Sequence, residues 1–464
     1  MKKKEYEVII VGAGPAGIFT ALELSKKNNM SILILEKGKE LDQRVCQMRS
    51  KKESCFHCSP CSLLSGWGGA GAFSDGKLNL STEIGGQLDN YIDKDKVNSL
   101  IKYTDDIYLE FGADKTIYGI NKEEIDIIKR EASLASLELI PSKIRHLGTE
   151  KCTKILKKMY HYLKNKITIQ TDTEVKRILI DKGKAIGIET TEGEIIKGDF
   201  IIASPGRAGS EWLKRQADDL NIKISNNPVD VGVRVEVPAI TMKRLTDIIY
   251  ESKLVYYTQL FDDRVRTFCM CPYGEVVIEF SDSITSVNGH SYQEHRTDNT
   301  NFALLVSTAF TEPFKEPIAY GKYIARLANI LSGGVIVQRL GDLELGRRST
   351  QERINRSIVI PTLKEATPGD LSFVLPYRIL TDIIEMLKAM DKIAPGVYSK
   401  HTLLYGVEVK FYSSRLELSE CLETEINNLF AAGDGAGITR GLIQASTSGI
   451  IVADEILKRR NKDR

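Results

Sequence analysis

Residues 8–36 combine a short apolar strand, a glycine-rich turn, a helical segment and a second apolar strand. The run Val8–Val11 consists of β-branched residues, which is typical of a strand buried in a parallel sheet. The turn Gly-Ala-Gly-Pro-Ala-Gly occupies residues 12–17, and the second strand, Ile32–Leu35, ends at Glu36. This order predicts a βαβ unit at the start of the chain.

The glycines of this turn have the spacing that a dinucleotide site requires. Gly12 permits the tight turn, Gly14 lets a pyrophosphate approach the backbone, and Gly17 lets the helix pack close to the sheet. The N-terminus of the helix faces the phosphates, and Glu36 is placed to accept hydrogen bonds from a ribose diol. We therefore predict a dinucleotide site. A glycine turn in an ordinary βαβ unit is the alternative.

Length and composition limit the class of protein. A chain of 464 residues is too long for one simple core, so two or three domains are expected. Hydrophobic and charged contents of 42% and 27% are typical of a soluble globular protein, and a net charge of +2 does not indicate a nucleic-acid partner. No apolar run reaches the roughly 18 residues of a membrane span, and the basic first four residues lead into the glycine turn without a cleavage motif. A cytoplasmic location is expected.

Four of the eight cysteines lie between residues 46 and 61, namely Cys46, Cys55, Cys58 and Cys61. Thiolates three residues apart in a loop can converge on one centre, and four thiolates suit an iron–sulfur cluster or zinc. The spacing predicts a metal site with these four ligands. A [4Fe–4S] cluster is favoured because the cysteines follow a predicted redox-cofactor site. Structural zinc and redox-active or incidental thiols remain open.

A second glycine-rich segment follows at once, Gly-Trp-Gly-Gly-Ala-Gly at residues 66–71. Such glycine density predicts a loop that a ligand approaches closely, although a tight structural turn has the same composition. Ser74 and Lys77, just beyond it, could place polar groups near a ring or a phosphate. They are the predicted proton donors together with His146, for which a capping or packing role is an equal alternative.

The rest of the chain predicts a second domain and a return to the first. Residues 229–237 alternate apolar and polar side chains, as a half-buried strand does, and further strand patterns follow to residue 280. Cys269 and Cys271 share one such strand and, with a period of two, one face. Near the C-terminus, residues 428–432 form a short apolar strand that ends in Gly433-Asp434, and Gly441 opens a final helix. The N-terminus of that helix would present free N–H groups to a ligand.

These motifs resemble those of the two-dinucleotide-binding-domain flavoproteins, the FAD-dependent oxidoreductases of the glutathione-reductase-like superfamily. The resemblance rests on the glycine turn with Glu36, on Ile201-Ile202-Ala203 with Gly206, and on Ala432-Gly433-Asp434 before the final helix. Residues 68–77, 269–272 and 433–441 are similar to a bacterial family of FAD-dependent dehydrogenases. Two departures are clear: the chain has no second strand–GxGxxG–helix followed by an acid, and no C-x4-C near the flavin site.

The resemblance implies an α/β fold in which a Rossmann-like FAD-binding domain is built from discontinuous segments. It would comprise residues 1–221, with the cysteine-rich loop 46–61 and a helical insert 86–165, and residues 401–464. Residues 222–400 would form a second α+β domain with a mostly antiparallel sheet. The implied FAD-binding residues are Gly12, Gly14, Ala16, Gly17, Glu36, Lys37, Gly69, Val175, Ala203, Gly206, Gly433, Asp434, Gly441, Gln444 and Ala445.

The expected function is that of an FAD-dependent oxidoreductase, a reductase or dehydrogenase, acting on a small organic substrate over the flavin. The expected electron partner is NAD(P)H or, if the cysteines hold an iron–sulfur cluster, a ferredoxin that supplies single electrons. A flavin and cluster redox carrier or sensor without its own small-molecule turnover is the alternative.

Overall fold

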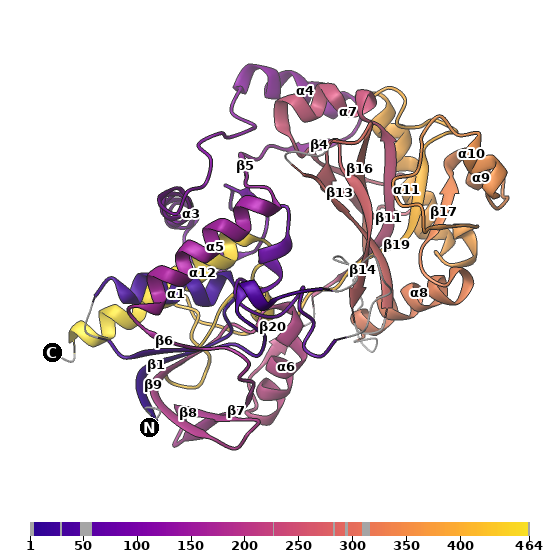
Figure 1. Cartoon of the computed structure of the whole chain (residues 1–464). Helices are drawn as coiled ribbons and strands as arrows, with labels where there is room; N and C mark the ends of the chain where they lie inside the picture. The colour runs from indigo at the N-terminus through magenta and orange to yellow at the C-terminus, as the bar shows by residue number, and fades with distance from the viewer. Residues whose placement is uncertain are drawn as a thin grey trace. The chain divides into compact units, whose positions relative to one another are not determined.

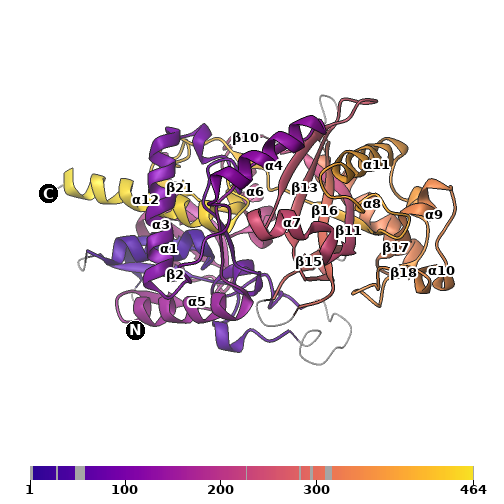
Figure 2. The same cartoon turned by 90° about the horizontal axis from the view of Figure 1, so that it is seen from above.

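The computed structural model describes residues 4–27, 30–46, 58–225, 227–281, 284–292, 296–308 and 316–462. The chain divides into two compact units, each described by itself below. Unit 1 consists of Met1–Thr116, Arg145–Asn227 and Tyr412–Arg464, and unit 2 consists of Ile117–Ile144 and Pro228–Phe411. Figures 1 and 2 label their helices and strands.

Unit 1 contains a seven-stranded sheet in the order β6-β2-β1-β9-β8-β7, with β21 also paired with β9. Its strands are β1 (Glu5–Val11), β2 (Ile32–Leu35), β6 (Thr168–Gln170), β7 (Val175–Asp181), β8 (Lys184–Thr190), β9 (Ile195–Ala203) and β21 (Leu429–Ala431). The strands β6, β2, β1, β9 and β21 run parallel to one another, whereas β8 pairs antiparallel with β9 and β7 antiparallel with β8. The apolar runs predicted at residues 8–11 and 32–35 are the buried centre of this sheet.

The order of the parallel strands creates a switch point between β1 and β9. From β1 the chain first adds β2 and β6 on one side, and later adds β9 and β21 on the other side. Open α/β sheets bind ligands outside the carboxyl ends of the strands at such a point. The fold therefore places the segments that follow β1, β9 and β21 at one location.

Helices cover this sheet, and they are α1 (Pro15–Ser25), α3 (Lys94–Glu110), α5 (Thr149–Lys164), α6 (Ser210–Asp219) and α12 (Leu442–Lys462). Figures 1 and 2 show α1, α3, α5 and α12 together on one side of the sheet. The helices α1 and α12 approach closely at Gly449, whose backbone oxygen accepts a 3.1 Å hydrogen bond from Thr20. The last helix of the chain is therefore packed against the first.

Unit 2 is built on an eight-stranded sheet in the order β18-β17-β19-β11-β16-β13-β12-β4. Its strands are β4 (Glu138–Ile140), β11 (Val229–Pro238), β12 (Lys253–Tyr257), β13 (Arg264–Cys271), β16 (Asn299–Thr308), β17 (Ile336–Arg339), β18 (Thr367–Pro368) and β19 (Leu403–Lys410). All neighbours are antiparallel except β17 and β18. Figure 1 shows β13, β16, β11 and β19 side by side.

The apolar face of this sheet is covered by helices. The helices of unit 2 are α4 (Lys122–Leu134), α7 (Ala239–Ile249), α8 (Pro317–Ser332), α9 (Leu340–Glu344), α10 (Gln351–Asn355) and α11 (Tyr377–Asp391). Valines 229, 231, 233, 235 and 237 of β11 join one core with side chains of α4, α7, α8 and α11. A hairpin of β14 (Glu275–Ser281) and β15 (Ile284–His290) completes the unit.

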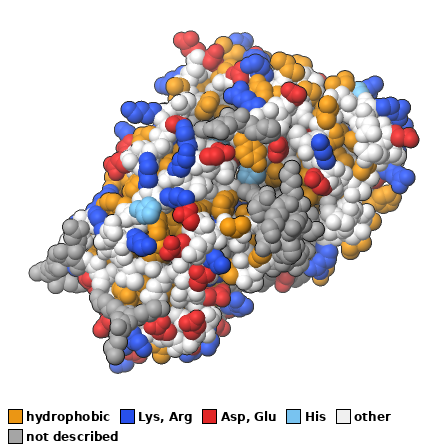
Figure 3. Space-filling model, viewed as in Figure 1, with side chains coloured by type: hydrophobic (Ala, Val, Ile, Leu, Met, Phe, Trp, Pro, Cys, Tyr) orange, Lys and Arg blue, Asp and Glu red, His pale blue; other side chains and the backbone are white. Residues whose placement is uncertain are grey.

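Four short strands remain, β3 (Lys77–Asn79), β5 (Ile144–His146), β10 (Ile224–Ser225) and β20 (Arg415–Leu416). None of the helices in the described ranges is long and apolar enough to cross a membrane. On the face drawn in Figure 3, lysine and arginine side chains alternate with aspartate and glutamate and form no continuous basic stripe.

The predicted fold class is confirmed, and the predicted domain boundaries need three corrections. Residues 222–227 belong to unit 1, because β10 pairs with β20. Residues 117–144 belong to unit 2 and not to a helical insert of unit 1, because β4 pairs with β12. Residues 401–411 also belong to unit 2, because β19 pairs with β11 on one side and with β17 on the other. These last two segments complete a sheet whose other strands are distant in the sequence.

The contact between α1 and α12 predicts the effect of Gly449→Ala. The added Cβ would lie 2.1 Å from the backbone oxygen of Ala16 and 2.9 Å from the backbone nitrogen of Thr20. Alanine favours a helix by up to about 1 kcal/mol over glycine, but overpacking against rigid backbone costs about 1–3 kcal/mol. We expect a net loss of about 1–2 kcal/mol in the free energy of unfolding, measured by urea denaturation.

The control is Lys458→Ala on the exposed side of the same helix, with an expected change within about 0.5 kcal/mol. A Gly449→Ala protein as stable as the wild type would contradict the close packing of the two helices.

Candidate functional site

The carboxyl ends of β1 and β9 are joined by hydrogen bonds just beyond the sheet. The backbone N–H of Ser204 donates to the carbonyl of Val11 at 2.8 Å. The hydroxyl of Ser204 lies 3.1 Å from the same carbonyl and 3.2 Å from that of Gly12. The predicted site residue Ala203 is fully buried at the end of β9, so what faces the glycine turn is the backbone beyond it.

Two of the three glycines in the turn are required by packing. Gly12 has a φ of +105°, and a Cβ there would lie 2.3 Å from the carbonyl oxygen of Ser204. A Cβ on Gly17 would lie 2.1 Å from the carbonyl oxygen of Gly12. These positions exclude any side chain even in the absence of a ligand.

Gly14 differs from its two neighbours because the space beside it is open. It is the N-cap residue of α1, with φ −78° and ψ −177°, which any residue can adopt. A Cβ built on Gly14 has no other heavy atom within 4 Å, and the same is true of Gly206 after β9. The space beside the backbone at the N-terminus of α1 is therefore free of protein atoms, and the phosphate contact of Gly14 stays a prediction.

The second glycine-rich segment lies against the first residues of two helices. A Cβ on Gly69 would lie 3.2 Å from the Cα of Gly14. A Cβ on Gly71 would lie 2.6 Å from Leu442 Cδ2 and 3.6 Å from Pro15 Cγ. The N-termini of α1 and α12 thus meet at one loop, and each brings N–H groups without intrahelical acceptors and a partial positive charge.

Gln444, predicted to contact the cofactor, holds a neighbouring loop in place. Its side chain is fully buried, and its amide nitrogen donates to the carbonyls of Thr82 at 2.9 Å and Ile84 at 3.1 Å. This loop brings Gly85 beside Gly441, where a Cβ on Gly441 would lie 3.2 Å from the Cα of Gly85. The groups that this helix start can present to a ligand are therefore backbone groups.

The carboxylate of Glu36, another predicted site residue, accepts hydrogen bonds from three separate loops. Its carboxylate is buried and accepts backbone N–H groups from Ala13 at 2.9 Å, Gly38 at 2.8 Å and Gly66 at 2.9 Å. The sequence predicted a ribose ligand for this side chain but not these three donors. Glu36 fixes the glycine turn and the second glycine-rich segment relative to the end of β2.

The remaining predicted cofactor residues lie around this frame. Asp434, after β21, accepts a 2.7 Å hydrogen bond from Thr439, and its second oxygen lies 3.8 Å from Arg207 Nε. Val175 is buried at the start of β7, two residues beyond Thr173, whose N–H donates to the carbonyl of Glu36.

Four further predicted residues have mainly structural contacts. Lys37 donates to the carbonyl of Ala208 at 3.1 Å. Ala16 is buried, and its Cβ lies 3.0 Å from the position that a Cβ on Gly433 would take. Ala445 is buried in the first turns of α12, where its N–H donates to the carbonyl of Gly441.

The three predicted proton donors have different environments. Lys77 is buried, with its ammonium 2.9 Å from the carboxylate of Asp75. The hydroxyl of Ser74 donates to the carbonyl of Gly71 at 2.8 Å and accepts the N–H of Gly76 at 3.2 Å, which are the contacts of a turn residue. His146 is buried, and the next residue, Leu147, donates its N–H to the carbonyl of Gly76. The fold thus brings the segments of Lys77 and His146 together.

The predicted metal ligands are only partly within the described residues, because Cys55 lies outside them. In the part of the chain that the structure describes, the thiols of Cys46, Cys58 and Cys61 are free, and their sulfurs do not all lie within 4.8 Å of one another. The four-cysteine metal site stays a prediction.

Arg44 is a buried charged residue that the sequence did not single out. Its guanidinium donates to the carbonyls of Ser62 at 2.9 Å, Leu63 at 2.9 Å and Trp67 at 2.7 Å. Burial lowers the pKa of Arg44 to about 10, although the carboxylate of Glu36 acts in the opposite direction. The side chain anchors the segment that joins the cysteines to the second glycine-rich loop, and no local sequence pattern marks it.

One family model matches the longer of the two segments that form unit 2. Residues 228–411 match the family described as FAD-dependent protein, C-terminal domain-like. This match covers less than half of the chain. An uncharacterized protein of Clostridium beijerinckii is 28% identical over 484 aligned residues, which cover 97% of this chain and 80% of that protein.

Solved structures show only a general similarity. Glycine oxidase from Geobacillus kaustophilus is 12% identical, with a TM-score of 0.40 over 98% of this chain and 95% of that one. L-proline dehydrogenase from P. horikoshii is 14% identical, with a TM-score of 0.43 over 98% and 94% of the two chains. Values this low establish neither a substrate nor a reaction for this chain.

The contacts of Glu36 predict a large effect of Glu36→Gln. Each carboxylate oxygen of Glu36 accepts at least one backbone N–H. Replacing either oxygen by an NH₂ group therefore leaves at least one buried N–H facing a second donor and without an acceptor. Hydrogen bonds to charged groups contribute about 1.5–3 kcal/mol, so we expect a loss of about 2 kcal/mol in the free energy of unfolding, measured by urea denaturation.

Glu425→Gln, at an exposed position, is the matched control and should change stability by less than about 1 kcal/mol. Equal stability of the two variants would show that the three N–H contacts of Glu36 do not hold the loops.

Proposed function

We propose that the chain is an FAD-dependent oxidoreductase with FAD bound to unit 1. The observation on which this rests is the open backbone at Gly14, located at the switch point of a parallel sheet and at the N-terminus of α1. The neighbouring N-terminus of α12 and the FAD-dependent description of the family that residues 228–411 match support it.

The residues present fit the parts of FAD. The backbone of residues 12–17 would hold the diphosphate. Glu36 would hold the adenosine ribose, because one carboxylate oxygen accepts two N–H groups and the other only one, which leaves acceptor capacity on the second. Asp434 would accept a hydrogen bond from a hydroxyl of the ribityl chain. The N-terminus of α12 would stabilise negative charge on the flavin ring. When bound, FAD supplies two-electron chemistry and exchanges single electrons.

The proposed substrate is a small organic compound. Of the three predicted proton donors, Lys77 and His146 are the stronger candidates, because the hydroxyl of Ser74 is engaged in its own turn. The ammonium of Lys77 lies 2.9 Å from the carboxylate of Asp75, which would fix its position. The proposed electron partner is NAD(P)H or a ferredoxin.

We further propose that Cys46, Cys55, Cys58 and Cys61 hold a [4Fe–4S] cluster through which a ferredoxin delivers single electrons. The spacing of four cysteines before the second glycine-rich loop supports this, and structural zinc is the alternative occupant.

The FAD proposal predicts that Gly14→Ala lowers affinity for FAD without loss of stability. The methyl group enters space that is empty of protein atoms but that the diphosphate would occupy. We expect the Kd of the apoprotein for FAD to rise at least about tenfold, or about 1.4 kcal/mol. Flavin fluorescence on titration measures this, and thermal unfolding of the apoprotein checks that stability is unchanged.

Gly334→Ala in unit 2 is the control, because its nearest other atom would be 3.9 Å away and it has no positive φ. Its Kd should equal that of the wild type. Wild-type affinity in Gly14→Ala would rule out the diphosphate position, and a wild-type protein that binds no FAD would rule out the proposal as a whole.

The cluster proposal predicts about four irons and four sulfides per chain after anaerobic purification. Cys58→Ser should remove most of the iron and the visible cluster absorption while FAD stays bound, whereas Cys421→Ser should change neither. One zinc per chain and no iron would support the structural alternative. A metal content that Cys58→Ser does not alter would exclude Cys58 as a ligand.

A further inference from the structure

A β-bulge interrupts β13 of unit 2 at its two cysteines. Phe268 pairs with Ala303 and Cys271 pairs with Asn301, so three steps along β13 face two steps along β16. The extra residue is accommodated by Cys269, whose φ is +43°, in the left-handed region that non-glycine residues rarely adopt. Bulges of this kind redirect side chains, and they are frequent beside functional sites.

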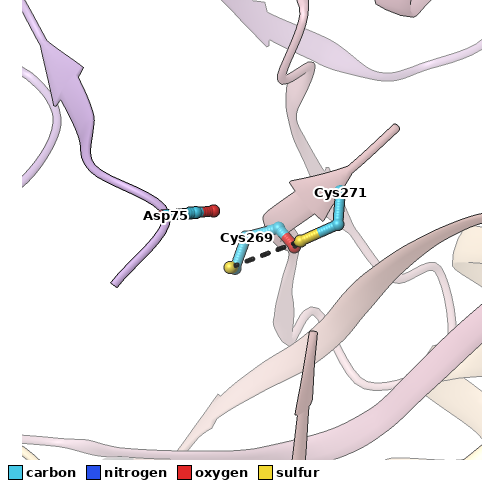
Figure 4. Close-up of side chains that lie close together, drawn as sticks. All are labelled: Asp75, Cys269 and Cys271. Atoms are coloured by element: carbon cyan, nitrogen blue, oxygen red, sulfur yellow. Dashed lines mark hydrogen bonds between the residues drawn. The ribbon is translucent and has the colours of Figure 1, made fainter. Parts of the chain in front are cut away.

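The bulge leaves the two thiols facing each other. The sulfurs of Cys269 and Cys271 lie 4.0 Å apart. Figure 4 draws the two side chains with this contact. Cys269 is half-buried and Cys271 fully buried. Between them, Met270 is fully buried in the core of unit 2 and anchors the segment from the opposite side.

A disulfide between these two residues needs little backbone movement. Residues two apart in an extended chain have Cα atoms no more than about 6.6 Å apart, within the range of about 4.4–6.8 Å found for disulfides. Both sulfurs are already in contact, so rotation about the side-chain bonds can close the remaining distance.

A buried guanidinium adjoins the pair. Arg234 of β11 is fully buried, and one of its terminal nitrogens lies 3.3 Å from the sulfur of Cys271 and 2.5 Å from the carbonyl oxygen of Cys269. A cation within hydrogen-bond distance stabilises a thiolate over a thiol, and the thiolate is the nucleophile in disulfide exchange.

Buried partners bind the guanidinium of Arg234 and stabilise its charge. Glu408 lies 3.3 Å from its second terminal nitrogen, and Asn301 accepts from its Nε at 2.8 Å. Burial acts to lower the pKa of Arg234. Glu408 and the two sulfurs act in the opposite direction and outweigh burial, so the pKa of Arg234 lies above its ordinary value. Lys410, 3.2 Å from Glu408, places a second cation in the same network.

We propose that Cys269 and Cys271 form a redox-active dithiol that closes to an intramolecular disulfide by exchange with a low-molecular-weight disulfide. The thiolate of Cys269, the more exposed residue, attacks the small disulfide and releases one thiolate. Cys271, stabilised as a thiolate by Arg234, attacks the mixed disulfide at the sulfur of Cys269 and releases the second. The two protons of the dithiol pass to the two released thiolates, so the protein is oxidised by two electrons and the small disulfide is reduced by two.

The experiment treats the folded full chain with glutathione disulfide, then alkylates free thiols in acid-quenched samples and digests them with trypsin. The peptide of residues 267–296 contains no lysine or arginine before its last residue, and Cys269 and Cys271 are its only cysteines. We expect this peptide to lose both alkylation sites after oxidation. Its mass, measured by mass spectrometry, should be lower than that of the unalkylated dithiol peptide by two hydrogens. Dithiothreitol should restore both sites.

Matched variants distinguish the pair from ordinary thiols. Cys269→Ser and Cys271→Ser should each prevent the loss of two hydrogens and yield at most one glutathione adduct. Cys421→Ser, at a lone half-buried thiol, should leave the reaction of the 267–296 peptide unchanged. In the urea-unfolded wild type, disulfide formation should be slower by about tenfold, because Arg234 then no longer lies beside Cys271.

Two results would overturn the proposal. One is full alkylation of both cysteines in the folded wild type at every ratio of glutathione disulfide to glutathione. The other is a folded wild type that accumulates glutathione adducts on this peptide without closing the disulfide. Neither readout requires flavin. The dithiol proposal can therefore fail while the FAD proposal holds, and the FAD proposal can fail while the dithiol proposal holds.

Discussion

A single buried carboxylate organises the candidate cofactor site. Glu36 accepts N–H groups from Ala13, Gly38 and Gly66, and these belong to the glycine turn, the end of β2 and the second glycine-rich segment. A buried charge is stable only when hydrogen-bonded, so the carboxylate and the three loops depend on each other. The position of the second glycine-rich segment against the starts of α1 and α12 follows from this arrangement.

Residues near the C-terminus complete unit 1 by adding a strand to its sheet and a helix to its core. The strand β21 extends the parallel sheet beside β9, and α12 packs on α1 so closely that Gly449 admits no side chain. Two helix N-termini consequently lie at one loop. Their N–H groups and partial positive charges suit an anionic ligand without any lysine or arginine, and Gly14 leaves space for it.

Unit 2 shows a different use of buried charge. Its central strand β11 places valines on one face and Asp230, Arg234 and Glu236 on the other, and all of these are buried. The charge of Arg234 is balanced by Glu408. The carboxylate of Glu236 accepts hydrogen bonds from the hydroxyls of Thr362 and Tyr405. Such a network fixes the geometry around Cys269 and Cys271, because moving one group leaves another without its partner.

The sequence by itself determined the βαβ unit, the need for glycine at positions 12 and 17, and the return of the chain at Gly433 and α12. These features follow from local patterns: β-branched strands, backbone that only glycine permits, and helix starts. Only the tertiary structure decided that Glu36 binds three loops, that Arg44 is buried, that residues 117–144 and 401–411 belong to unit 2, and that the polar face of β11 is not solvated. Each of these depends on partners distant in the sequence, and alternation along a strand does not reveal what covers its second face.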